Sequence, residues 1–158
     1  MPDQGDLAPD VTLQLGDGSN VKLSQMKLPL VLYFYPKDDT SGCTVEAKDF
    51  TALLPIFEKE GTSVLGVSKN SPKDHAKFTA KYDLKVPLAT DADGSVTEAF
   101  GTWGEKSLYG RKYMGIERAT FLIDEEGRIA RAWRKVSVKG HAEEVLAAAR
   151  ALKGTRPS

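Results

Sequence analysis

The sequence predicts an α/β protein with a mixed central β-sheet, helices on both faces of that sheet and an N-terminal β-hairpin. Two apolar runs rich in β-forming residues, 30–35 and 63–68, have the pattern of strands covered on both faces. Each run is followed by a segment with helical periodicity. Near residue 119 this strand–helix alternation gives way to a hairpin and a final helix, an order typical of a mixed sheet.

The chain of 158 residues is expected to form a single domain over 1–158, with a lead-in over 1–10 and a tail over 153–158. Lys and Arg together number 22, as do Asp and Glu, so no net field attracts nucleic acid or an anionic membrane. The N-terminal stretch MPDQGDLAPD lacks the basic and apolar regions of a signal peptide, and no apolar run approaches the ~20 residues that span a bilayer. We therefore expect a cytoplasmic protein that binds neither nucleic acid nor a membrane.

The first elements in the chain are predicted to form a β-hairpin. Residues 11–15 and 20–23 alternate apolar and polar side chains on either side of a Gly-Asp-Gly turn. Residues 24–27 are expected to form a short helical turn before the apolar strand at 30–35 begins.

The strand at 30–35 ends at Pro36, and after a loop over 37–42 a helix is predicted with Cys43 in its first turn. One apolar stripe of this helix faces the sheet and consists of Phe50, Leu53, Leu54 and Phe57. Pro55 falls inside the pattern, so we expect a kink there, or a break and a restart.

After the strand at 63–68, a second helix is predicted from Ser71 to about Tyr82. Ser71 is a good N-cap, and Pro72 suits the first helical position. The short strand that follows, at 86–90, is expected at or near a sheet edge, because Pro87 has no N–H to donate.

The last third of the chain begins with a turn at 91–94 and a brief helix that ends at Gly101. Residues 101–115 contain four glycines without a steady period, so they are expected to form a loop or an irregular hairpin. The remaining elements are expected to be a strand at 119–124, a strand at 128–135 and a helix at 141–152.

The one cysteine, Cys43, lies where a helix N-terminus is predicted, and the partial positive charge there stabilises a thiolate. A cysteine is more often a small buried apolar residue. However, Thr40, Gly42 and Thr44 surround this thiol with hydroxyl and backbone N–H groups, which suit a peroxide or an oxyanion better than an apolar pocket. One cysteine and two histidines cannot supply a Cys/His zinc site of four ligands.

Residues 36–46, PKDDTSGCTVE, resemble the P-x-x-x-T-x-x-C motif of the peroxiredoxins, and most closely that of the bacterioferritin comigratory protein/peroxiredoxin Q subfamily. The resemblance continues through 64–68, 109–110 and 115–124, and it covers about residues 5–152. It implies a thioredoxin-like fold and a thiol peroxidase that reduces hydrogen peroxide and organic hydroperoxides. It implies no cofactor and no metal.

The resemblance also implies roles for the matching residues of the motif. Cys43 would be the peroxidatic thiolate, which peroxide oxidises to a sulfenic acid. Thr40 and the backbone at Gly42 and Cys43 would bind the peroxide. Pro36 would shield the thiolate from water.

Arg118, just before the strand at 119–124, would stabilise the thiolate and the polarised O–O bond. Its ordinary alternative is a surface salt bridge, the usual fate of an arginine. Glu46 is expected to interact with the helix dipole and to position the arginine rather than to act as a base.

Two histidines and three aromatic residues lie outside the motif. His75 and His141 fall in early helix turns, so we expect them at solvated positions remote from Cys43. Trp103, Tyr109 and Tyr113 suit equally well packing anchors and a docking surface for a reductant.

The chain departs from much of the subfamily at Lys48, where many members have a resolving cysteine. On an intact helix, a residue five positions after Cys43 lies about 8–9 Å away, beyond the ~7 Å Cα–Cα limit of a disulfide. This chain therefore resembles the one-cysteine variants. Its reductant is expected to be an external thiol: thioredoxin, a glutaredoxin–glutathione system, another small thiol, or Cys43 of a second subunit. The resemblance implies a monomer or a weak dimer.

Three other functional classes are open to test. The main alternative is a thioredoxin-fold binding or chaperone module whose thiol is not catalytic. A disulfide oxidoreductase is a poor fit because the chain has no C-x-x-C motif. A cysteine hydrolase would need a histidine beside the thiol.

Overall fold

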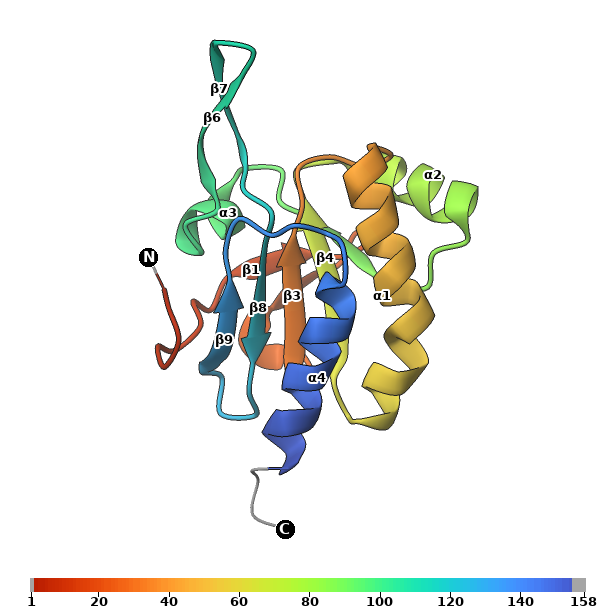
Figure 1. The fold of residues 1–158 in the computed structure, drawn as a ribbon, viewed down its shortest axis with the longest axis vertical. Coiled ribbons are helices and arrows are strands. Elements are labelled where there is room, and N and C mark those ends of the chain that lie inside the picture. The colour runs from red at the N-terminus through yellow and green to blue at the C-terminus, as the bar shows by residue number, and fades with distance from the viewer. Residues whose placement is uncertain (1, 155–158) are drawn as a thin grey trace.

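The computed structural model describes residues 2–154 and contains a seven-stranded sheet with helices on both faces (Figure 1). The strands of the sheet are β1 (Thr12–Gln14), β2 (Asn20–Lys22), β3 (Leu30–Phe34), β4 (Ser63–Ser68), β5 (Leu88–Thr90), β8 (Ala119–Ile123) and β9 (Ile129–Trp133). The helices are α1 (Ser41–Lys59), α2 (Pro72–Tyr82), α3 (Ser95–Ala99) and α4 (His141–Gly154), together with one 3-10 turn at Leu23–Gln25. The strand order is β2-β1-β5-β4-β3-β8-β9.

Strand β3 lies at the centre of the fold, parallel to β4 and antiparallel to β8, and all five of its residues are buried. Successive side chains point to opposite faces of the sheet. Val31 and Tyr33 belong to the core that α1, α2 and α4 cover. Leu32 and Phe34 belong to the second core, beneath β1 and α3. The carboxyl end of β3 therefore delivers the chain to the start of α1 between two packed layers.

Helix α1 is continuous from Ser41 to Lys59, so the expected break at Pro55 is wrong. Pro55 lies on the exposed side of the helix and lacks only the N–H that would bond the Thr51 carbonyl. Phe50 and Phe57 are fully buried on the opposite side. This burial of apolar surface offsets the missing hydrogen bond and keeps the helix in one piece.

The position of strand β5 in the sheet differs from the position expected from Pro87. The strand lies inside the sheet, between β1 and β4, and not at an edge. Pro87 precedes the strand, so its missing N–H removes no bond from the ladder. The carbonyl of Pro87 still accepts a hydrogen bond from the backbone N–H of Gly66, with N···O 3.0 Å.

Residues 103–116 form a separate two-stranded hairpin, β6 (Trp103–Leu108) and β7 (Arg111–Ile116), that projects away from the main sheet (Figure 1). Of the two expected alternatives, a hairpin is therefore correct, but the expected irregularity is wrong, because its register is unbroken from Trp103–Ile116 to Leu108–Arg111. The turn residues Tyr109 and Gly110 both have positive φ, 52° and 77°. Two such residues in succession define a type I′ turn, which matches the twist of a β-hairpin.

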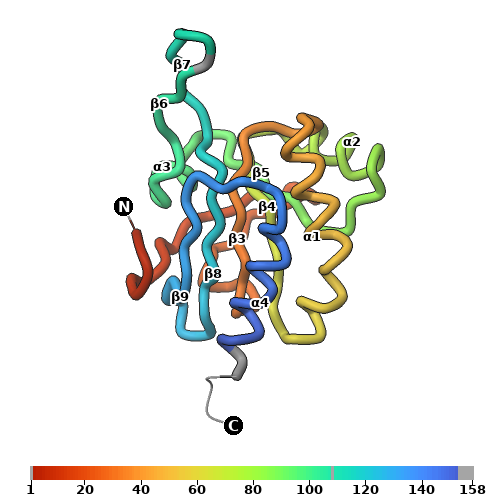
Figure 2. The backbone as a smooth tube through the Cα atoms, viewed as in Figure 1, coloured from red at the N-terminus to blue at the C-terminus, as the bar shows by residue number. Residues whose placement is uncertain are grey.

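The N-terminal segment runs beside β9 (Figure 2), where Leu7 forms an isolated bridge with Arg128. Helix α4 extends to Gly154, two residues beyond the expected end, and residues 155–158 of the expected tail lie outside the described residues. None of the helices within residues 2–154 is long and apolar enough to cross a membrane.

Candidate active site

Cys43 lies in the first turn of α1, directly after the loop that leaves β3. Thr40 is the N-cap residue, with extended backbone, and Cys43 is the third residue of the helix. The Thr40 hydroxyl does not cap the helix; it donates to the Lys37 carbonyl, with Oγ1···O 2.9 Å. Because the hydroxyl proton is used in this hydrogen bond, the Thr40 oxygen can act only as an acceptor toward other groups. Cys43 itself is only 2% exposed.

Arg118 contacts both Cys43 and Glu46. Its Nη2 donates to Cys43 Sγ at 3.3 Å, and its Nη1 donates to Glu46 Oε1 at 2.7 Å. Burial alone would lower the pKa of Arg118, but Glu46 and Cys43 raise it above its usual value, so the guanidinium stays charged. A Cβ on Gly42 would lie 3.1 Å from Nη2, so the glycine leaves the space that the guanidinium occupies.

Glu46 lies one turn along α1 from Cys43 and is 1% exposed. Burial raises the pKa of Glu46 to about 7, and the nearby Arg118 charge keeps it from rising further. Its second oxygen, Oε2, has no hydrogen-bond partner within residues 2–154. Glu46 therefore contacts Arg118 through a single charge-assisted hydrogen bond.

Tyr33, on β3, is a neighbour of the site that the sequence reasoning missed. Its ring stacks on Phe50, with centroids 4.7 Å apart, and its buried hydroxyl has no partner among the described residues. Burial, followed by the charges of Glu46 and Cys43, raises the pKa of this hydroxyl well above its usual value. The alternation of β3 places Tyr33 on the α1 side of the sheet, and that pattern was the available signal.

The expectation of solvated histidines is wrong for both residues. His75 is 3% exposed and His141 is 4% exposed. The ring nitrogens of His75 face Asp38 and the Ala89 carbonyl, while Nε2 of His141 faces the Thr120 hydroxyl at 2.8 Å. Polar partners from distant segments offset the free-energy cost of burying the two histidine rings. In the described part of the chain, neither ring is hydrogen-bonded to Cys43, so the Cys–His pair of a hydrolase is not formed.

The three aromatic residues of the hairpin region differ in their surroundings. Trp103 is half-buried against the second core, and Lys69 Nζ lies 3.9 Å from its ring centroid. Tyr109 is 97% exposed and Tyr113 is 47% exposed. Trp103 is therefore a packing anchor, whereas the two tyrosines are not.

Pro36, half-buried, is the first residue after Tyr35.

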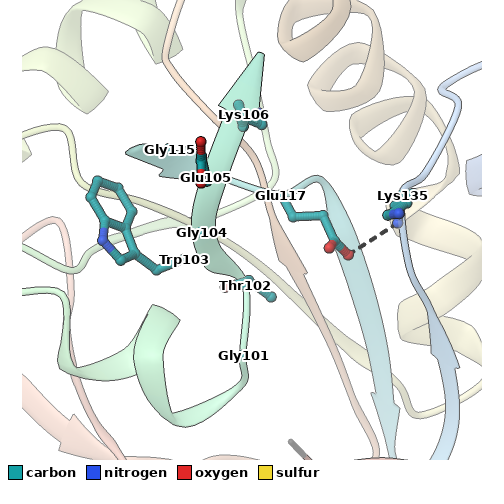
Figure 3. Close-up of a pocket in the computed structure, with 9 residues that line it drawn as sticks. All are labelled: Gly101, Thr102, Trp103, Gly104, Glu105, Lys106, Gly115, Glu117 and Lys135. Atoms are coloured by element: carbon teal, nitrogen blue, oxygen red, sulfur yellow. Dashed lines mark hydrogen bonds between the residues drawn. The ribbon is translucent and has the colours of Figure 1, made fainter. Parts of the chain in front are cut away.

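A cavity of about 200 Å³ lies at the foot of the hairpin (Figure 3). One of its lining residues, Glu117, directly precedes Arg118 in the sequence. Figure 3 shows Trp103 on one side and Glu117 facing Lys135 on the other. The Glu117 carboxylate accepts from the Lys135 backbone at 3.1 Å and from Arg134 Nε at 2.7 Å. The Arg118 carbonyl accepts from the backbone of Val136 at 2.9 Å. The segment after β9 thus holds the backbone from which Arg118 reaches the thiol.

Comparison with known proteins gives consistent similarities over nearly the whole chain. The AhpC/TSA family matches residues 4–132. Peroxiredoxin Bcp of Xanthomonas campestris pv. campestris is 49% identical over 143 residues, which are 90% of this chain and 89% of that protein. Peroxiredoxin Bcp of Bacillus subtilis is 48% identical over 90% of this chain and 91% of its own length.

Solved structures agree with these similarities. The bacterioferritin comigratory protein of Xanthomonas campestris, studied for its alkyl peroxide reduction activity, superposes with a TM-score of 0.86 at 46% identity, over 94% of this chain and 97% of that one. A cysteine-to-serine mutant of Xylella fastidiosa PrxQ superposes with a TM-score of 0.89 at 43% identity, over 96% and 97% of the two chains. The thioredoxin-like fold implied by the motif is therefore confirmed.

Proposed function

Because the chain belongs to the AhpC/TSA family, and within it to the bacterioferritin comigratory protein/peroxiredoxin Q subfamily of peroxiredoxins, it is a thiol-dependent peroxidase, and we propose that Cys43 is its peroxidatic residue. Its substrate is a peroxide and its reductant is a thiol. The observation that supports the proposal for Cys43 is the hydrogen bond from Arg118 Nη2 to Sγ, 3.3 Å long, at the start of a helix.

In the proposed first half of the cycle, the Cys43 thiolate attacks one oxygen of the peroxide. The O–O bond breaks, the attacked oxygen stays on sulfur as a sulfenic acid, and the other oxygen takes up a proton and leaves as water or an alcohol. Arg118 and the backbone N–H of Cys43 stabilise the negative charge that moves from sulfur to the leaving oxygen.

The neighbouring residues have supporting roles in this proposal. The Thr40 hydroxyl already donates to the Lys37 carbonyl, so it accepts the O–H of the peroxide and aims the O–O bond at sulfur. Gly42 leaves room for Arg118, Pro36 keeps water from the thiolate, and Glu46 orients the guanidinium. Both hydrogen peroxide and organic hydroperoxides are proposed as substrates, in line with the alkyl peroxide reduction of the Xanthomonas campestris relative.

In the proposed second half, two thiols restore the enzyme. The first attacks the sulfenic sulfur, releases water and forms a mixed disulfide with Cys43. The second attacks that disulfide and frees the Cys43 thiolate. The chain has no other cysteine, so both thiols come from outside, from thioredoxin, a glutaredoxin–glutathione system or a small thiol. A monomer or weak dimer in the cytoplasm suits a single unpaired cysteine.

A peroxidase assay with each reductant supplied in turn tests this proposal. Cys43→Ser is expected to abolish turnover, because serine has no nucleophilic thiolate, while Ser41→Ala, two residues away on the exposed side of the same turn, is expected to turn over at close to the wild-type rate. Dimedone should label wild-type Cys43 after peroxide treatment. Peroxide turnover that survives in Cys43→Ser would refute the assignment. Slow alkylation of Cys43 with no dimedone adduct would favour the alternative, a binding or chaperone module with a non-catalytic thiol.

A further inference from the structure

We call the loop at 36–40 the active-site loop. A buried polar cluster at this loop has no role in the mechanism above. The cluster consists of Tyr35, Asp38 and His75, which are 0%, 8% and 3% exposed. Asp38 belongs to the active-site loop, two residues before Thr40, and His75 belongs to the first turns of α2. Burying a carboxyl group and an imidazole is costly unless both are fully hydrogen-bonded, so the contacts of this pair are informative.

The hydrogen bonds of the cluster require a shared proton. Asp38 Oδ1 accepts from the Tyr35 hydroxyl at 2.6 Å, and Oδ2 lies 2.7 Å from His75 Nδ1. The opposite ring nitrogen, Nε2, lies 3.0 Å from the Ala89 carbonyl, which can only accept, so Nε2 carries a hydrogen. A further proton must then lie between Nδ1 and Oδ2. The Asp38 backbone also donates to Asn70 Oδ1 at 2.9 Å. Asp38 is thus hydrogen-bonded to the residue that follows β3, to α2 and to the segment between β4 and α2.

Asp39 provides a second, exposed connection to the other end of α2. Its φ is 59°, and its carboxylate accepts from Lys81 Nζ at 2.8 Å and from the Tyr82 hydroxyl at 2.5 Å. Lys48, five residues after Cys43 on α1, places Nζ 5.4 Å from the Tyr82 ring centroid. Both ends of α2 therefore hold the active-site loop, and α1 is connected to the same end of α2 as Asp39.

Asp38, Asp39 and Lys81, which form these contacts, also line a hollow of about 390 Å³ beside the loop and α2, together with Lys37, Asn70 and Lys77 among others. Figure 1 shows α2 beside the start of α1, at the end of the sheet where the loop leaves β3. Removing the Asp38–His75 contact would therefore loosen the loop at the N-terminal end of α2, while Asp39 still bonds Lys81 and Tyr82 at the other end.

The two halves of the reaction place opposite demands on this loop. Peroxide reduction needs Thr40 and Cys43 in the observed arrangement, and hydrogen peroxide is the smallest reactant of the cycle. Even a small reductant thiol such as dithiothreitol is bulkier than hydrogen peroxide, and Cys43 is only 2% exposed, so the start of α1 has to move before that thiol can reach the sulfenic sulfur. Any contact that holds the loop favours the first half-reaction and slows the second.

We propose that Asp38 and His75 are positioning residues that hold the active-site loop on α2 in its peroxide-reducing arrangement, and that release of this contact controls access of the external thiol to oxidised Cys43. The proposal rests on the peroxidase function of Cys43 and adds the residues that set the balance between the two half-reactions. Because the chain lacks a resolving cysteine, this access step governs every turnover.

The test measures the two half-reactions separately by stopped flow. Reduced protein is mixed with hydrogen peroxide, and in a second experiment protein oxidised by one equivalent of peroxide is mixed with dithiothreitol. His75→Phe keeps a ring of similar shape but removes both N–H groups. It is expected to oxidise about tenfold more slowly and to be reduced about tenfold faster, a shift of ~1.4 kcal/mol in each barrier.

Asp38→Asn is the conservative variant that should rescue both rates. The asparagine amide can donate to Nδ1 of a neutral His75 and accept from Tyr35, while Nε2 still donates to Ala89, so every bond is kept without the shared proton. Both rates are expected within about threefold of wild type. His141→Phe is the matched control: it removes the other buried histidine, which bonds Thr120, and should leave the ratio of the two rates unchanged.

Lys81→Met keeps the proposal testable if His75→Phe does not fold. It removes an exposed contact of Asp39 and is expected to shift both rates in the same two directions by about threefold. The proposal is overturned if the rates of His75→Phe, or of Lys81→Met in its place, are unchanged or fall together, or if Asp38→Asn behaves like His75→Phe. A wild-type protein whose Cys43 peroxide does not oxidise would instead refute the function on which the proposal rests.

Discussion

At the scale of single residues, Arg118 determines the electrostatics of the thiol site. Its guanidinium is planar and presents separate N–H groups, so one side chain can bond Cys43 and Glu46 at the same time. A compact ammonium group cannot match this geometry. The arginine is therefore expected to be needed for its shape as well as its charge.

Arg118→Lys is expected to lower the second-order rate constant for oxidation of Cys43 by hydrogen peroxide by about 10²-fold, because a lysine keeps the charge but cannot contact both partners. The rate is measured by stopped flow with excess peroxide. Arg131→Lys is the matched control, since Arg131 bonds Glu144 on the surface and not the thiol, and its rate should stay within about threefold of wild type. An Arg118→Lys protein that oxidises at the wild-type rate would contradict the role of the guanidinium.

Glu46 is expected to make stability depend on pH near neutrality. Burial raises its pKa to about 7 in the folded protein, from an ordinary value of 4.5, so the folded state binds the proton more tightly than the unfolded state. The resulting stabilisation is fully present below pH 4.5 and is lost as the pH rises through 7. Between pH 5 and pH 8 the wild type should lose roughly 2 kcal/mol of unfolding free energy relative to Glu46→Gln. Urea unfolding of both proteins at these two pH values measures the difference, and parallel pH dependences would refute it.

At the scale of elements, the unit formed by β3, the active-site loop and α1 places Cys43, and the projecting hairpin stands apart from it. The hairpin contains only β6 and β7, and its turn places a bulky residue, Tyr109, at φ 52°. A non-glycine residue in that region costs about 1 kcal/mol, and asparagine tolerates it better than tyrosine does. The hairpin is therefore expected to open locally before the main sheet unfolds.

Tyr109→Asn is expected to stabilise the hairpin, because Asn-Gly is the preferred type I′ turn. Hydrogen exchange of the β6 and β7 amides should slow by about threefold, while the melting temperature of the whole protein stays the same. Tyr113→Asn is the matched control: the same substitution at a strand position should speed exchange, since asparagine is unfavourable in a strand. Equal effects of the two substitutions would contradict the turn assignment.

At the scale of the whole molecule, the depth of Cys43 limits how two copies of the chain can react with each other. Cys43 is 2% exposed in the first turn of α1, so two such sulfurs cannot meet while the helix is intact. A disulfide also needs the two Cα atoms within about 7 Å. Resolution by a second copy of Cys43 is therefore the least favourable of the thiol sources considered above.

Peroxide-treated protein is accordingly expected to run as a monomer on a non-reducing gel, with mass spectrometry showing sulfenic acid on Cys43. The same treatment in 8 M urea, which exposes the thiol, should produce disulfide-linked dimers and serves as the positive control. Extensive dimer formation in native buffer would show that the start of α1 opens widely without a reductant.

Much of this protein is determined by its sequence alone, because the relevant patterns are local. The apolar runs predict β3 and β4, the Ser71 cap and Pro72 predict the start of α2, and the loop chemistry around Cys43 makes it the candidate nucleophile before any fold is known. Glycine and the turn residues mark most of the element ends. Each of these features depends on neighbours a few positions away.

Only the tertiary structure decides which polar groups are buried and with which partners. Arg118 meets Cys43 across 75 positions of sequence, His75 meets Asp38 across 37, and no periodicity encodes either pairing. Because sequence patterns do not encode such distant pairings, the predictions for β5 and for both histidines are wrong. A buried ionisable group is tolerated only where distant segments supply its hydrogen bonds, and the folded chain alone brings those segments together.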